Sequence, residues 1–388
     1  MASAVETRIQ QALERCVELG EIGVQVAAYL GEELIVDAWI GEADPDTGRK
    51  VDGDTLFPSF SVCKAVTAVA LHLQAERGLV EYDAPVSRYW PEFAQHGKDT
   101  VTLRHVLSHR SGVPHLPPDT TVERFLDWDW MVEGIAALEL LAEPGAKSSY
   151  QAMSFGWIVG EVVRRTDPQN RHFGRFVRDE ICDPLGIDDL WIGLPPEEEG
   201  RVAKLVSPDG YRGNTGPDLA PLRSLALPVP PSPDNFNRHD VHQACIPAAN
   251  GIMTARAQAR FWALLANRGK LDEVGLLPEG AVWSYATPSP NPHEFDQVIG
   301  VVPFIGQNGF WIGGSYPPAE PGVGEGRWIV CHPGGGGSIG WADIEHRLAV
   351  SFCHNRMFSN FPYRPAHEHP HAVIGDAVRE IAGITGWA

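Results

Sequence analysis

Ser61 and Lys64 are separated by two residues in the segment Leu56-Phe-Pro-Ser-Phe-Ser-Val-Cys-Lys64. If a helix begins near Ser61, the two side chains lie one turn apart on the same face, so the lysine amine reaches the hydroxyl. A serine hydroxyl is a weak nucleophile until a neighbouring base takes its proton, and a lysine with a lowered pKa serves as that base. The start of a helix also offers free N–H groups to a developing oxyanion. The pair therefore predicts a nucleophilic serine.

The same pair has a structural interpretation, in which Ser61 caps a helix and Lys64 is solvated. Ser-x-x-Lys pairs arise by chance in long chains, so the motif alone is weak. Its surroundings favour chemistry, because residues 65–69 are mostly apolar. A charged side chain on such a helix lies at an exposed edge or is buried for a reason.

Two later segments offer groups that complement this pair. Tyr150 stands at a loop-to-helix junction, where a tyrosine either packs under the helix or points into a cleft as a phenolate base. The strand-like run Trp328-Ile-Val-Cys-His332 leads through Pro333 into four consecutive glycines, residues 334–337. Glycine lets a backbone approach a ligand closely and present its N–H groups, and four in a row exceed the need of a turn.

In this order and spacing, the three segments resemble the motifs of the serine β-lactamase/penicillin-binding-protein superfamily. Within it, the chain is most similar to the family VIII carboxylesterases, which are esterases that resemble class C β-lactamases. Further stretches carry the resemblance, which covers about residues 5–385; they lie at 101–112, 178–186 and 246–256.

The resemblance implies a role for each matching residue. Ser61 is the nucleophile, and Lys64 and Tyr150 together shuttle its proton. The reaction implied is two-step acyl transfer, in which acyl-Ser61 forms, an alcohol leaves and water then attacks. A small-molecule ester is the implied substrate, with no cofactor and no metal.

The third motif implied by the resemblance is His332, Pro333 and Gly334, along the edge strand of the cleft. The backbone N–H groups of Ser61 and Gly335 would form the oxyanion hole, which is often the largest single catalytic term. Specificity is expected from the loops around 128–130, 228–236 and 291–295.

Two departures from the superfamily pattern bear on the substrate. Penicillin-interacting members have Tyr-x-Asn and Lys-Thr-Gly or Lys-Ser-Gly, whereas Ala152 and His332 stand at the Asn and Lys positions here. Both changes remove polar groups that bind the amide and carboxylate of a β-lactam. The sequence therefore favours a carboxylesterase with weak action on β-lactams. The alternatives are an acyltransferase or transesterase, a β-lactamase or amide hydrolase, and a non-catalytic ligand-binding protein.

Three other signals compete with this interpretation. Ser338 lies in Gly336-Gly-Ser-Ile-Gly340, which fits the nucleophile elbow of α/β-hydrolases, but a strand rather than a helix is expected after it. Alternating histidines at 367, 369 and 371 fit a metal site less well than a solvated loop, because Pro370 interrupts them. Cys63 is expected to be a small buried residue.

The elements that must position these groups form an α+β pattern. A helix is predicted over 4–19, two strands over 23–30 and 33–40, and a helix over 61–77. Residues 85–235 carry short helical patterns, including 134–142 and 153–166. Strands are predicted over 298–305, 327–331 and 346–353, and helices over 255–267 and 372–384. We therefore expect a β-lactamase-like antiparallel sheet flanked by helices, built from 1–80 and 240–388, with a mainly helical insert, 81–239, and the active-site cleft between them.

Composition narrows the partners and the compartment. The chain has 388 residues and a formal net charge of −19, which disfavours nucleic acid and anionic membranes as partners. No apolar run approaches a signal peptide or a membrane span. The six cysteines are scattered without a Cys-x-x-Cys pair, which is typical of free thiols in a reducing compartment. A cytoplasmic protein is expected, and nothing in the sequence indicates its oligomeric state.

Overall fold

The main sheet is antiparallel and joins the two ends of the chain. The computed structural model describes residues 4–208, 220–313, 320–358 and 368–384. Seven strands lie in the order β3-β2-β1-β12-β11-β10-β9. Their bounds are β1 Gly23–Leu30, β2 Glu33–Asp44, β3 Arg49–Lys50, β9 Trp311–Ile312, β10 Ile329–Pro333, β11 Ile339–Asp343 and β12 Leu348–His354.

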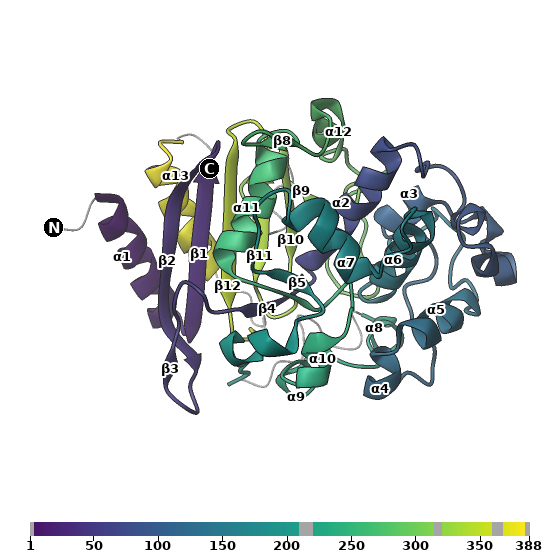
Figure 1. Cartoon of the computed structure of the whole chain (residues 1–388), viewed down its shortest axis with the longest axis horizontal. Helices are drawn as coiled ribbons and strands as arrows, with labels where there is room; N and C mark the ends of the chain where they lie inside the picture. The colour runs from purple at the N-terminus through teal and green to yellow at the C-terminus, as the bar shows by residue number, and fades with distance from the viewer. Residues whose placement is uncertain (1–3, 209–219, 314–319, 359–367, 385–388) are drawn as a thin grey trace.

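Helices cover both faces of this sheet (Figure 1). Side chains of successive strand residues point to opposite faces, and β11 shows this directly. Its Gly340 would place a Cβ against Trp262 of α11 (Ala255–Ala266), whereas the Trp341 ring contacts Arg379 of α13 (Pro370–Ile381). Helix α1 (Ala4–Glu18) packs beside α13. The antiparallel sheet flanked by helices that the sequence predicts is therefore confirmed.

The central part of the chain is mainly helical. Helix α2 (Cys63–Glu76) packs on α6 (Ser154–Thr166) and also contacts β10 of the sheet. The other helices are η1 Val86–Arg88, η2 Pro91–Thr100, α3 Leu103–Leu107, α4 Val122–Phe125, α5 Trp128–Ala136, α7 Phe173–Val177, η3 Arg178–Cys182, η4 Pro196–Arg201, α8 Arg223–Ala226, α9 Pro233–Phe236, α10 His239–Gln243 and α12 Glu279–Ser284.

A small second sheet, in the order β4-β6-β5, links the two parts. Its strands are β4 Phe57–Phe60, β5 Leu190–Ile192 and β6 Gly251–Met253, and β7 Lys270–Leu271 pairs with β8 Val274–Gly275 elsewhere. Because β5 belongs to the predicted insert and pairs with β6 outside it, the parts are interleaved. We retain as a proposal the division into 1–80 with 240–388 and an insert of 81–239.

Two predicted elements are wrong. The strand predicted over 298–305 is a turn, because Asp296 accepts hydrogen bonds from the N–H groups of Val298 and Ile299 and closes a loop back to residue 301. The helix predicted over 134–142 begins earlier, as α5, because the Asp127 carboxylate caps it by accepting from Trp130 N–H.

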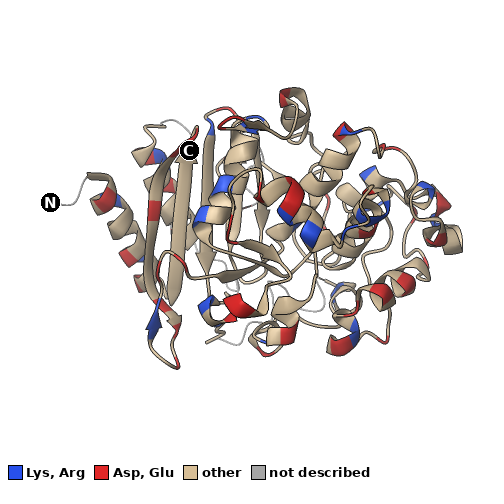
Figure 2. Ribbon diagram, viewed as in Figure 1, with Lys and Arg blue, Asp and Glu red and all other residues tan. Residues whose placement is uncertain are grey.

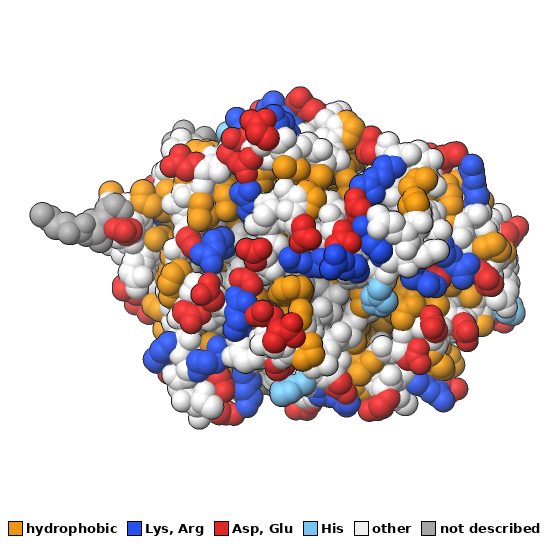
Figure 3. Space-filling model, in the orientation of Figure 1, with side chains coloured by type: hydrophobic (Ala, Val, Ile, Leu, Met, Phe, Trp, Pro, Cys, Tyr) orange, Lys and Arg blue, Asp and Glu red, His pale blue; other side chains and the backbone are white. Residues whose placement is uncertain are grey.

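Charges of both signs are spread over the surface. Lys and Arg alternate with Asp and Glu along the helices (Figure 2). On the face in Figure 3, acidic and basic side chains are interspersed with apolar ones. Within the described residues, no helix is both long enough and apolar enough to cross a membrane.

Candidate active site

Ser61 lies between β4 and α2, and its hydroxyl contacts Lys64. The lysine Nζ donates to Ser61 Oγ at 2.8 Å, to the Ala152 carbonyl at 2.8 Å and to the Ala248 carbonyl at 2.7 Å. Lys64 is fully buried. Three acceptors thus hold the amine in place, and one of them is the hydroxyl that the sequence predicts to be the nucleophile.

Burial also sets the charge of this amine. It lowers the pKa of Lys64 from 10.5 to about 7, because the ammonium loses its hydration and no carboxylate compensates for that loss. The nearest titratable influence is Cys63, whose own pKa is raised to about 11 by burial. A substantial fraction of Lys64 is therefore neutral near pH 7 and able to accept a proton.

The backbone before Ser61 is strained. Phe60 has a φ of 49°, a left-handed conformation that is costly for a bulky side chain and is common at functional sites. The chain then turns into α2, with Lys64 N–H donating to the Ser61 carbonyl at 2.9 Å. Ser61 is half-buried, so the turn leaves this residue partly exposed.

Tyr150 reaches the same hydroxyl from the other side. Its titration is influenced by the Ser61 side chain, and Lys64 Nζ lies 5.0 Å from the centre of its ring. Burial raises the pKa of Tyr150 above its ordinary value, against the lowering effect of the polar Ser61 side chain. The neutral phenol is therefore the dominant form at neutral pH, and it can donate a proton.

Two groups that the sequence did not single out hold Tyr150. The His109 ring lies 4.6 Å from the Tyr150 ring, and His109 Nδ1 accepts from Gln151 N–H. Asp296, also buried, accepts from Tyr150 N–H at 2.6 Å and from Ser148 Oγ at 3.0 Å. The available signals were weak: His109 lies in the stretch 101–112 that carries the family resemblance, and Asp296 follows the predicted specificity loop 291–295.

The third motif places an uncharged histidine in the site. His332 is fully buried, and its ring lies 6.4 Å from that of Tyr150 and 6.2 Å from that of Trp311. Burial, reinforced by the nearby Lys64, lowers its pKa to about 3. Nδ1 lies 2.8 Å from the Pro333 carbonyl, and Nε2 has no hydrogen-bond partner among the described residues. His332 is thus a neutral polar group with an unused ring nitrogen.

The glycines that follow His332 lie against the nucleophile segment. A Cβ on Gly334 would come within 2.3 Å of the Ser59 carbonyl oxygen, and one on Gly335 would contact the Phe60 ring at 3.8 Å. Across the described part of the chain, the N–H groups of Ser61 and Gly335 donate to no other backbone group. The two predicted oxyanion-hole donors therefore come from adjacent segments. Strand β10 is not the edge strand expected, because the short β9 pairs outside it at Val330 and Cys331.

The competing signals lie elsewhere in the fold. Ser338 directly precedes strand β11, not a helix, and accepts from His354 N–H, so it is not a nucleophile elbow. Cys63 is buried, as predicted, and its thiol donates to the Pro247 carbonyl. His367 lies outside the described residues. His371 contradicts the solvated-loop prediction because it is buried in α13. No group of metal-ligating side chains occurs among the described residues.

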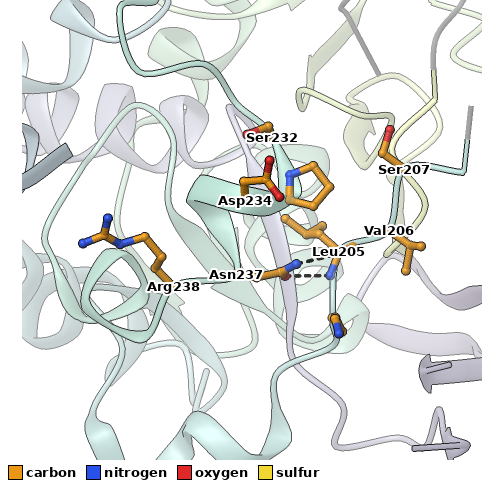
Figure 4. A pocket seen from close by; sticks show the side chains of 9 residues that line it. Leu205, Val206, Ser207, Ser232, Asp234, Asn237 and Arg238 are labelled. Carbon is orange, nitrogen blue, oxygen red and sulfur yellow. Dashed lines mark hydrogen bonds between the residues drawn. The ribbon is translucent and has the colours of Figure 1, made fainter. Parts of the chain in front are cut away.

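A pocket of about 610 Å³ lies beside α9. It is lined by residues 204–207 and by α9 with its flanks, and Asn237 holds its two sides together through hydrogen bonds to both backbone groups of Leu205 (Figure 4). The Phe236 ring of α9 lies 5.0 Å from that of Phe60. The predicted specificity loop 228–236 therefore packs directly behind the residue before Ser61.

Comparison with known proteins agrees with this geometry. A family model described as Beta-lactamase matches residues 5–372. The chain is 33% identical to the esterase/beta-lactamase LipL of Mycobacterium tuberculosis over 87% of its own length and 78% of that protein. Two solved structures each align over 98% of both chains: a family VIII carboxylesterase, with a TM-score of 0.85 and 29% identity, and a penicillin-binding protein homologue from Caulobacter crescentus, with a TM-score of 0.83 and 30% identity. The chain belongs to the Beta-lactamase family.

Proposed function

We propose that this chain is a serine carboxylesterase that hydrolyses small carboxylic esters through acyl-Ser61. The observation that carries the proposal is the 2.8 Å contact between Lys64 Nζ and Ser61 Oγ, made by a buried amine whose pKa is lowered to about 7. Such an amine is poised to take the hydroxyl proton at neutral pH. The names of the relatives, esterase/beta-lactamase LipL and a family VIII carboxylesterase, support the same reaction class.

In the acylation step, Ser61 Oγ attacks the ester carbonyl carbon while its proton passes to Lys64. The carbonyl oxygen becomes an oxyanion, which the N–H groups of Ser61 and Gly335 stabilise. When the tetrahedral intermediate collapses, the carbon–alkoxide bond breaks and the alkoxide needs a proton. The phenol of Tyr150 supplies it, because burial keeps that group protonated, and the Lys64 ammonium then reprotonates Tyr150.

Deacylation repeats these steps with water as the nucleophile. Water gives its proton to the Tyr150 and Lys64 pair, its oxygen bonds to the acyl carbon, and the proton returns to Ser61 Oγ as the acid departs. An alcohol that replaces water at this stage gives acyl transfer by the same route. The two outcomes differ only in which acceptor reaches the acyl group.

An ester is favoured over a β-lactam by two positions in the site. His332 is neutral, so it offers no cation to the carboxylate that β-lactams carry. At position 152, alanine supplies only its carbonyl, and that carbonyl is occupied by Lys64 Nζ. A β-lactam would therefore bind without its usual anchors, and slow turnover is expected.

The proposal is tested by steady-state hydrolysis of p-nitrophenyl acetate, butyrate and octanoate beside the cephalosporin nitrocefin. Wild type is expected to turn over esters faster than nitrocefin, and Ser61→Ala to lose both activities. Rapid nitrocefin turnover with poor ester cleavage would instead assign the chain to the β-lactamases. Full ester turnover by Ser61→Ala would overturn the nucleophile assignment.

We also propose a cytoplasmic location, with a small-molecule ester as substrate and with neither nucleic acid nor membrane as a partner. Its support is that all six cysteines are free and that five of them are buried, as in proteins of reducing compartments. Cell fractionation with an antibody against the chain tests it, and recovery of the protein outside the cytoplasmic fraction would contradict it.

A further inference from the structure

The glycine loop, residues 334–337, has a front and a back. Its front lies against Ser59 and Phe60, as the positions of Gly334 and Gly335 show. Its back lies against α13 and the end of β12, two elements that contribute no residue to the proposed chemistry. Helix α13 reaches the loop through a hydrogen bond from one histidine.

That histidine is His371, the second residue of α13. Its Nε2 hydrogen-bonds to the Gly337 carbonyl, and only 6% of the residue is exposed. Because a carbonyl oxygen accepts, Nε2 must carry the hydrogen, which fixes the tautomer. Nδ1 has no hydrogen bond among the described residues, and the closest carboxylate oxygen, on Glu320, is 4.0 Å away.

The ring of His371 is itself held in position. Phe352 of β12 packs edge-on against it with ring centres 5.2 Å apart, and the His369 ring lies 4.4 Å away. The backbone is fixed as well, since Gly322 is packed against the His371 carbonyl so tightly that a Cβ there would come within 2.1 Å of it. Because the His371 ring and backbone are both held, the Gly337 carbonyl that it bonds has little freedom to move.

Two backbone hydrogen bonds connect Gly337 to the front of the loop. Gly337 N–H donates to the Gly334 carbonyl at 3.1 Å, and Gly334 N–H donates to the Ser338 carbonyl at 2.7 Å. Gly337 has a φ of 125°, and a Cβ there would lie 2.8 Å from the ring of His354. The residue that His371 holds by its carbonyl therefore bonds, through its own N–H, to the peptide between Gly334 and Gly335, which carries the Gly335 N–H.

We propose that His371 is a positioning residue for the oxyanion hole, which it supports by fixing the glycine loop that presents the Gly335 N–H. This inference rests on the proposed function and adds a residue from the last helix to it. Loss of one oxyanion donor costs about 10²–10³ in kcat. Misplacing a donor costs less, so a loss of about tenfold is expected when the support is removed.

The test compares His371→Gln with His371→Met. Both side chains are unbranched and of similar length, but only glutamine keeps an N–H donor near the place of Nε2. The matched control is His346→Phe, a histidine at the opposite end of β11 that is bonded to Asp343. For each variant, kcat and KM on p-nitrophenyl butyrate are measured, together with Ki for an alkylboronic acid that mimics the tetrahedral intermediate.

The Met variant is expected to lose about tenfold in kcat and in boronate affinity, with KM within threefold of wild type. The Gln variant and the His346 control are expected to stay within threefold in all three. A Met variant equal to wild type, a change confined to KM, or an equal loss in the Gln variant would overturn the positioning role. If the Met variant does not fold, the Gln variant alone decides. A tenfold loss of its kcat would overturn the positioning role, and wild-type kcat would support that role. An inactive wild type would instead contradict the proposed function.

Discussion

The protonation of Lys64 controls the activity of this site, which makes pH the sharpest perturbation. The amine must be neutral to accept the Ser61 proton, and burial lowers its pKa to about 7. About 10% of the enzyme is then active at pH 6, about half at pH 7 and about 90% at pH 8. With the ordinary pKa of 10.5, only about 0.03% would be neutral at pH 7, roughly a thousandfold less.

The direction of the pH dependence follows from the lowered pKa of Lys64. A base with a lowered pKa is protonated and inactive in acid, so kcat/KM rises tenfold per pH unit below about 7 and levels off above it. The assay is hydrolysis of p-nitrophenyl butyrate from pH 5 to 9, followed at the isosbestic wavelength of p-nitrophenol, because this product titrates near neutrality. Blank rates are taken with Ser61→Ala.

The matched control is Lys98, the other fully buried lysine among the described residues, whose pKa burial lowers to about 8. It donates to the carbonyls of Gln95 and Leu138 and makes no contact with Ser61. Lys98→Met is therefore expected to keep the acid limb unchanged. A profile that is flat between pH 5 and 8, or one that still climbs tenfold per unit up to pH 9, would refute Lys64 as the base.

Four further substitutions are expected to separate chemistry from folding. Tyr150→Phe keeps the ring packing and should lower kcat by about 10²–10⁴ while costing at most about 1.5 kcal/mol of stability, which kinetics and urea unfolding measure together. Gly334→Ala places a Cβ 2.3 Å from the Ser59 carbonyl and should destabilise by about 1–3 kcal/mol or more, whereas Gly335→Ala should be tolerated in stability; equal unfolding midpoints would contradict this. Asp296→Asn should lower the free energy of unfolding by about 2 kcal/mol or more, because the asparagine NH2 group is a donor and cannot accept from the N–H groups that face it. Wild-type stability in this variant would show that the four hydrogen bonds of Asp296 are dispensable.

The motif-bearing elements were predictable because their signals are local. Helical periodicity after Ser61 and the β-rich runs at 23–30 and 33–40 match α2, β1 and β2 within a few residues. The Ser61 to Lys64 contact follows from local geometry, because the turn before α2 places the two residues one turn apart. These parts of the chain need no information from distant residues.

The missed parts depend on contacts between distant segments. The apolar run at 298–305 has strand-like composition. Its first N–H groups, however, donate hydrogen bonds to the carboxylate of Asp296, and the backbone forms a turn there. His109, Asp296 and His371 each act on residues more than 30 positions away. No spacing rule connects them, so only the folded chain brings them to Tyr150 and Gly337.

The central claim is that Ser61 carries the acyl group. The most direct measurement is intact-protein and peptide mass spectrometry after brief reaction with a fluorophosphonate and, separately, with p-nitrophenyl butyrate quenched in acid. We predict one adduct per chain, on the peptide containing Ser61, absent in Ser61→Ala and formed much more slowly in Lys64→Met. An adduct on Ser338 or on any other residue, or ester turnover with no adduct at Ser61, would contradict the account.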